Sequence, residues 1–97
     1  MKMKLPIAIY RVAERSMEPT LMEGDYILVW AAQCRLAPRD MVVMKHPASG
    51  ITLVKRVRLI EGARIYVEGD NGPESEDSRD FGAVEQSSIL GKVIFKV

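Results

Sequence analysis

The chain has 97 residues, of which 47% are hydrophobic and 28% are charged. This length and balance predict one globular domain, residues 1–97, and exclude a largely disordered chain. The formal net charge of +1 lacks the strong basic excess typical of nucleic-acid-binding proteins, so no nucleic-acid partner is expected.

Cysteine content and apolar runs suggest where the protein works. One cysteine, Cys34, rules out a disulfide within the chain and is typical of a reducing compartment. The longest apolar run, 26–32, is far shorter than the about 20 residues of a membrane-spanning helix. The apolar run 5–10 is too short for the core of a secretory signal and contains Pro6. We therefore expect a soluble, cytoplasmic protein whose chain encodes no membrane association.

Short strands separated by turns are predicted along the whole chain. Their ranges, in chain order, are 7–12, 26–30, 41–44, 51–54, 64–68 and 91–97. In the last of these, alternation places Val93, Phe95 and Val97 on one face. Single helical turns are expected within 14–21 and 85–89. The pattern indicates a mainly β fold, a single small domain with a curled, barrel-like sheet.

Ser16 is the candidate nucleophile. It opens the segment Ser-Met-Glu-Pro-Thr-Leu, which precedes the turn Gly24-Asp25 and an apolar strand. A serine hydroxyl is a poor nucleophile unless a neighbouring base takes its proton. The one histidine, His46, precedes Pro47 with no catalytic pattern around it, so we expect an ordinary loop residue. A lysine can replace histidine as the base.

Lys55 is the candidate base. A lysine accepts a proton only in its neutral form, which an apolar environment favours because it penalises the charged form. Alternation along the strand places Lys55 on the same face as Leu53 and Val57. The alternative is a lysine on an edge strand that discourages aggregation. Both interpretations fit the pattern.

The segment 68–80 is acidic and polar, and it is predicted to be one long loop. Its spacing of Asp and Asn does not match a calcium-binding loop, and the chain suggests no metal and no cofactor. Hydroxyls at Ser75 and Ser78 lie beside Asp77 and Arg79. Because a serine hydroxyl can orient a neutral lysine without adding a full charge, this loop is a candidate partner of the base.

Four segments together resemble the type I signal peptidases and the wider signal peptidase/LexA-like superfamily. They are Ser16-Met17-x-Pro19-Thr20-Leu21 with Gly24-Asp25, then Asp40 to Pro47, then Lys55-Arg56-Val57, then Gly69-Asp70-Asn71 with Ser75-x-Asp77-Ser78-Arg79. The resemblance extends from about Val12 to Val93. In its size and its stretch 70–73 the chain resembles the short soluble proteases of the nickel-superoxide-dismutase maturation type.

This resemblance implies a serine endopeptidase with a Ser/Lys dyad that removes an N-terminal leader from a protein precursor. Ser16 would attack the scissile carbonyl and Lys55 would take its proton, so we expect a hydrogen bond between the Ser16 hydroxyl and the Lys55 amine. Ser75 would support the base, and Asp77 and Arg79 would form a structural ion pair. The substrate would be a protein or peptide bound as an extended strand, with small residues at the first and third positions before the cut.

Two positions depart from the family pattern. Glu14 stands where relatives often have a small residue that supports the oxyanion hole, so the pattern does not identify a second oxyanion donor. Arg39 stands where a glycine usually precedes the aspartate, which affects a turn. The alternative function is a catalytically silent β-barrel module that binds peptides. Ser16, Lys55 and Ser75 together favour the protease, because a binding module needs neither a nucleophile nor a base.

Overall fold

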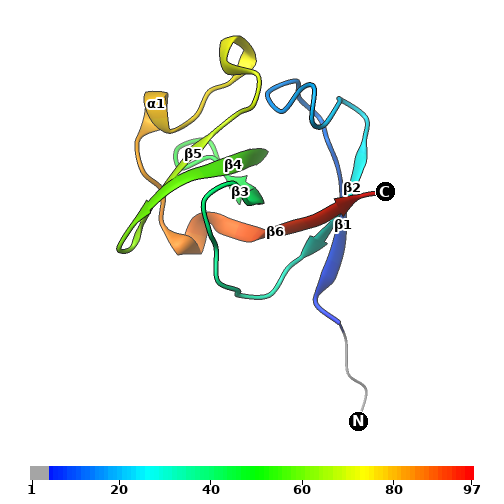
Figure 1. Cartoon of the computed structure of the whole chain (residues 1–97), viewed down its shortest axis with the longest axis horizontal. Helices are drawn as coiled ribbons and strands as arrows, with labels where there is room; N and C mark the ends of the chain where they lie inside the picture. Colours follow the sequence, from blue (N-terminus) through cyan, green and yellow to red (C-terminus); the bar gives the residue numbers. More distant parts are fainter. Residues whose placement is uncertain (1–4) are drawn as a thin grey trace.

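The computed structural model describes residues 5–97, which form one six-stranded antiparallel sheet (Figure 1). Its strands are β1 (Ile7–Arg11), β2 (Tyr26–Trp30), β3 (Met41–Lys45), β4 (Thr52–Glu61), β5 (Arg64–Glu68) and β6 (Ile89–Lys96). Across the sheet the order is β1-β2-β6-β3-β4-β5, so the last strand of the chain lies between β2 and β3. The prediction of a mainly β fold is confirmed.

Short helical segments connect the later strands of residues 5–97. They are η1 (Gly72–Glu74), α1 (Ser78–Phe81) and η2 (Gln86–Ser88). In the part of the chain described here, no helix is long and apolar enough to cross a membrane.

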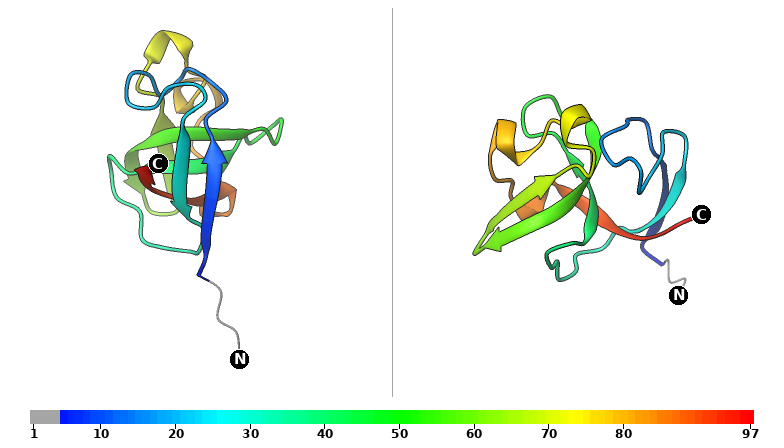
Figure 2. Two further views of the ribbon diagram at one scale, coloured as in Figure 1. Left: turned by 90° about the vertical axis from the view of Figure 1, so that its right-hand side faces the viewer. Right: turned by 45° about the horizontal axis from the view of Figure 1, so that its top comes forward.

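The sheet curls strongly instead of lying flat (Figures 1 and 2). Its register shifts in three of the strand pairings, between Leu28 and Val29, between Val43 and Met44, and between Val57 and Leu59. A β-bulge bends a strand and increases its local twist. These shifts therefore account for much of the curl, and they bring the ends of distant strands toward one another.

Two hydrophobic clusters cover the two faces of the central strands. The first contains Val12, Met17, Leu21, Ile27, Val29, Val43, Val54 and Val93. The second contains Val42, Met44, Leu53, Val57, Ile65, Val67 and Val84. Neighbouring residues of β3 and of β4 enter different clusters, because successive side chains of a strand point to opposite faces. Strands buried on both faces have nearly continuous apolar sequences, as β3 does.

Strand β4 is longer than predicted, because it continues through Lys55 to Glu61 before the chain turns back into β5. The turn contains two residues, Gly62 and Ala63. Gly62 has a φ of 60°, a left-handed value that glycine adopts without steric cost. The extra length matters for function, since it places Lys55 well inside the sheet and not at a strand end.

Two sequence expectations about helical and loop segments were wrong. The segment 68–80 is not one loop, because it contains η1 and most of α1. Helix α1 begins after Asp77, which forms a capping box with Asp80. The segment 14–21 forms turns without a helix, whereas 85–89 does contain η2.

The predicted alternation fails in β6. Val93 is buried opposite Val29, but Phe95 pairs with Leu28 and is 54% exposed. The shift in register leaves Ile94 as an extra residue between these two pairs. One extra residue reverses the faces of the residues that follow it. Phe95 therefore lies on the outer face.

Candidate active site

The predicted nucleophile lies in the loop 12–25, which joins β1 to β2. Three apolar side chains, Val12, Met17 and Leu21, anchor this loop in the first hydrophobic cluster. Ser16 lies between two of these anchors and is itself only 1% exposed. The spacing of the apolar residues thus explains why the loop folds back over the sheet with its serine facing inward.

The predicted base lies in the interior of the sheet. Lys55 is 1% exposed, and it lies on β4 between the buried residues Leu53 and Val57, as alternation predicts. Strand β4 is flanked by β3 and β5, so the interpretation of Lys55 as an edge-strand lysine is wrong. A lysine is almost never fully buried unless it is paired. The polar groups that contact the Lys55 amine therefore indicate the role of this lysine.

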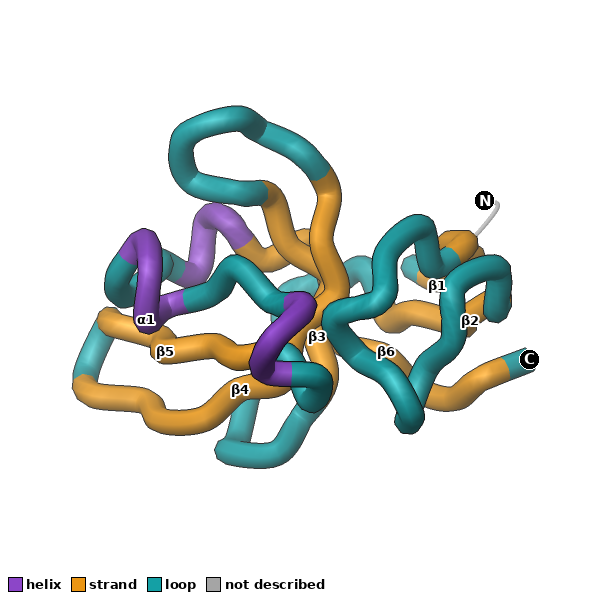
Figure 3. Tube along the Cα trace, turned by 90° about the horizontal axis from the view of Figure 1, so that it is seen from above, coloured by secondary structure: helices purple, strands orange, loops and turns teal. Residues whose placement is uncertain are grey.

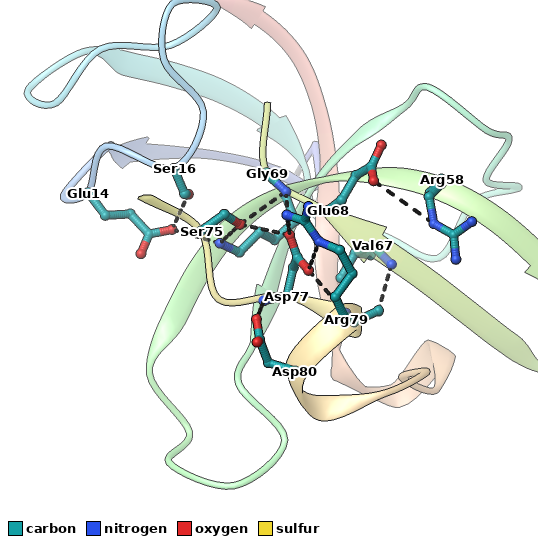
Figure 4. Close-up of polar contacts among 12 residues, drawn as sticks. Glu14, Ser16, Arg58, Val67, Glu68, Gly69, Ser75, Asp77, Arg79 and Asp80 are labelled. Atoms are coloured by element: carbon teal, nitrogen blue, oxygen red, sulfur yellow. Dashed lines mark hydrogen bonds and ion pairs between the residues drawn. The ribbon is translucent and has the colours of Figure 1, made fainter. Parts of the chain in front are cut away.

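The Lys55 amine contacts Ser75, which stands in the loop between η1 and α1. Lys55 Nζ donates to Ser75 Oγ at 3.1 Å, and the Gly69 backbone N–H donates to the same oxygen at 3.1 Å. Ser75 donates its own proton to Asp77 Oδ2 at 2.9 Å (Figure 4). Because an ionised carboxylate can only accept, the Ser75 oxygen presents lone pairs to Lys55. It can therefore orient the amine in either protonation state.

Asp77 organises this loop from a fully buried position. Burial raises the pKa of its carboxyl, but hydrogen bonds from the Arg79 side chain, the Arg79 and Gly69 backbone amides and Ser75 outweigh burial and hold that pKa well below its usual range. The Arg79 guanidinium donates through Nε at 2.9 Å and through Nη2 at 2.7 Å. The predicted contact between Asp77 and Arg79 is thus present, with the charged Asp77 carboxylate as acceptor.

Glu14 joins the two candidate catalytic side chains. The Ser16 hydroxyl donates to Glu14 Oε1 at 2.7 Å, and Lys55 Nζ lies 3.6 Å from that same oxygen. A direct hydrogen bond between Ser16 and Lys55 was expected, but it is not among those formed within residues 5–97. Sequence reasoning had noted Glu14 only as a departure from the family pattern. Its signal was a carboxylate two residues before the serine.

The loop after β5 packs beside the nucleophile loop (Figure 3). The Asn71 backbone N–H donates to the Ser16 carbonyl at 2.8 Å, and the Asn71 side-chain amide donates to the Arg15 carbonyl at 3.1 Å. The Thr20 hydroxyl donates to Asp70 Oδ2 at 2.6 Å. These bonds connect residues more than forty positions apart in the chain. They hold the loop that carries Ser16 in place relative to the sheet.

Asp70 also binds strand β4. Arg56 donates to its two carboxylate oxygens through Nε and Nη2, each at 2.8 Å, and through Nη1 to the Arg39 carbonyl at 2.7 Å. Arg39 has a φ of 81°, the left-handed region that favours glycine, which fits the family's usual glycine there. Sequence reasoning assigned no role to Thr20 or Asp70. Both stand in segments that carried the family resemblance, and this was the available signal.

A cavity of about 430 Å³ opens beside the Lys55 amine. Its lining comprises Glu14, His46, Ser49, Ile51, Leu53, Lys55 and Glu76. His46 contacts the Glu76 carboxylate through its ring Nε2. It therefore belongs to the cavity wall and is paired away from the serine. The cavity offers space for a substrate side chain next to Lys55 and Glu14.

The chain matches the family described as "Signal peptidase, peptidase S26" over residues 3–69 and 58–97. It is 34% identical over 58 residues to mitochondrial inner membrane protease subunit 1 of Xenopus tropicalis. That similarity covers 60% of this chain and 33% of the relative, so the chain spans about a third of that curated relative's length. The two matched ranges together cover all six strands, and the chain belongs to the signal peptidase family, peptidase S26.

Proposed function

We propose that this protein is a serine endopeptidase with a Ser16/Lys55 dyad. One observation carries the proposal: in a member of a peptidase family, a serine and a lysine from distant elements, each 1% exposed, meet at one oxygen of Glu14. Lys55 lies between the buried apolar residues Leu53 and Val57, and a base must be neutral to accept a proton.

In the proposed reaction the neutral Lys55 amine takes the Ser16 proton as Oγ attacks the scissile carbonyl. The oxyanion that forms accepts a hydrogen bond from the Ser16 backbone N–H. The Lys55 ammonium then gives its proton to the leaving amine, and an acyl-enzyme remains. Water, activated by the neutral amine, hydrolyses this ester. Ser75 keeps the amine in position throughout, and Asp77 with Arg79 keeps Ser75 in position.

We also propose the class of substrate, a protein precursor whose N-terminal leader is bound as an extended strand. The family match supports this class, and so does the resemblance of 70–73 to the nickel-superoxide-dismutase maturation type of protease. Small residues are expected at the first and third positions before the cut. Cleavage of a peptide library measures this preference, and a preference for large or charged residues at both positions would contradict it.

Matched variants test the dyad. Arginine keeps the charge and much of the size of lysine but does not deprotonate at working pH. Ser16→Ala and Lys55→Arg should therefore both lower the cleavage rate by at least about a hundredfold. Lys45→Arg, at the exposed end of β3, should leave the rate unchanged. The measurement is precursor cleavage by each purified variant, with circular dichroism to verify folding.

Two results would oppose the proposal. An active, folded Lys55→Arg enzyme would mean that another group is the base. A wild-type protein that binds extended peptides but never cleaves them would instead identify the silent β-barrel module.

A further inference from the structure

The Glu14 carboxylate contacts both groups between which the Ser16 proton must move. It accepts that proton's hydrogen bond at 2.7 Å and lies 3.6 Å from the Lys55 amine. The Glu14 side chain is 36% exposed, whereas that of Lys55 is 1% exposed. Building on the function proposed above, we propose that Glu14 is a positioning residue that keeps the free enzyme latent and sets the pH range in which it works.

The first step concerns the charge of Lys55. A negative group within about 4–6 Å favours the charged form of a lysine. The resulting ammonium has no lone pair and cannot accept the Ser16 proton. The Glu14 carboxylate therefore acts against the effect of the apolar residues around Lys55, and it disfavours the neutral amine that serves as the base.

Other groups near the amine do not have this effect. Ser75 is neutral and accepts from Lys55, and the Asp77 charge behind it is matched by Arg79. On the cavity wall, His46 and Glu76 pair with each other. Among the residues that the structure describes, Glu14 is thus the acidic residue whose side chain pairs with the Lys55 amine.

The second step concerns the nucleophile. While Ser16 donates to Glu14, its proton is held by the carboxylate oxygen and is not donated to Lys55. A carboxylate 2.7 Å from Oγ also opposes the negative oxygen that develops during attack, because like charges repel. Glu14 must therefore leave before the reaction. Its exposed side chain can turn toward solvent when a peptide strand enters, after which the ammonium releases its proton to water and the neutral amine accepts the proton of Ser16.

The test compares Glu14→Gln with the wild-type enzyme across pH. Glutamine keeps the size and one acceptor oxygen but removes the charge. The rising limb of the kcat/KM profile should move to lower pH, and kcat/KM near pH 7 should increase by about tenfold or more. Glu18→Gln is the matched control, since Glu18 stands in the same loop and pairs with Arg15 at 3.3 Å. It should keep the wild-type profile.

A second readout is independent of turnover. Heteronuclear NMR follows the protonation of the Lys55 side chain, and its midpoint should be lower in Glu14→Gln than in the wild-type protein. An unchanged midpoint, or a folded Glu14→Gln enzyme that is inactive at every pH while the wild type cleaves, overturns the inference. If no variant cleaves but the midpoint falls, the proposed function fails and the control of Lys55 by Glu14 stands.

Discussion

Gly69 shows how a single residue allows the site to assemble. A Cβ at this position would lie 2.5 Å from the Ser16 carbonyl oxygen and closer still to Ser75 Oγ. The carbonyl belongs to the backbone and cannot move aside cheaply. Only a residue without a side chain lets the loop after β5 approach both serines.

Gly69→Ala should therefore push Ser75 away from Lys55 and lower kcat/KM by about a hundredfold, because displacements near 1 Å have effects of this size. Gly72→Ala is the control, since its added Cβ would come no closer than 3.6 Å to an Arg79 nitrogen. Cleavage kinetics and thermal unfolding of both variants measure the effect. Wild-type kinetics in a folded Gly69→Ala protein would show that the close approach is dispensable.

Helix α1 and the loop before it depend on Asp77. Its carboxylate accepts from the Arg79 backbone N–H at the start of the helix and from the Gly69 N–H at the end of β5. Because these bonds hold its pKa below the unfolded value of about 3.9, Asp77 stabilises the fold fully above that pH. The contribution is lost as the pH falls further, toward the lower pKa of the folded state.

Asp77→Asn should thus lower the free energy of unfolding by about 1–3 kcal/mol at neutral pH. The difference from the wild-type protein should shrink below about pH 4, because the carboxyl of the unfolded wild-type chain then takes up a proton while that of the folded protein stays charged, which removes the advantage of the charge. Urea unfolding at several pH values measures this convergence. The exposed residue Glu85 supplies a control, and Glu85→Gln should change little at any pH. A deficit of Asp77→Asn that is independent of pH would contradict the role of its charge.

At the scale of the whole molecule, three segments far apart in the chain form one site. The network of Arg56, Asp70 and Thr20 joins strand β4, the loop after β5 and the nucleophile loop. Thr20 and Arg56 both donate to the Asp70 carboxylate, and the Asp70 side chain is 19% exposed. Charge-assisted, bidentate bonds are stronger and more directional than neutral ones. The network should therefore keep the nucleophile loop in place over the sheet.

Asp70→Asn should loosen this connection, with a loss of about tenfold in kcat/KM and about 1–3 kcal/mol in unfolding free energy. The pH at which activity rises should stay unchanged, which distinguishes this variant from Glu14→Gln. Glu68→Gln is the control, because Glu68 pairs with Arg58 at 4.0 Å with both side chains well exposed. If Asp70→Asn moved the pH profile, the network would be acting on the base as well as on the loop.

Much of the fold could be predicted because its signals are local. Runs of aliphatic residues identified all six strands, and alternation placed Lys55 correctly on the face of Leu53 and Val57. The same rule failed for Phe95, since a bulge in the pairing of β6 with β2 reverses the face and leaves no mark in the sequence of β6 alone. Helix α1 was missed even though Asp77 and Asp80 have the spacing of a capping box.

By itself, the sequence determined the β architecture, the candidate nucleophile and base, and the family resemblance, because residue type and spacing are properties of neighbouring positions. Only the tertiary structure decided that Glu14 contacts both Ser16 and Lys55, and that Asp70 connects Thr20 to Arg56. Such contacts depend on the strand order and on the curl of the sheet. Both arise from long-range pairing, which brings together residues whose separation in the chain carries no information about their distance in space.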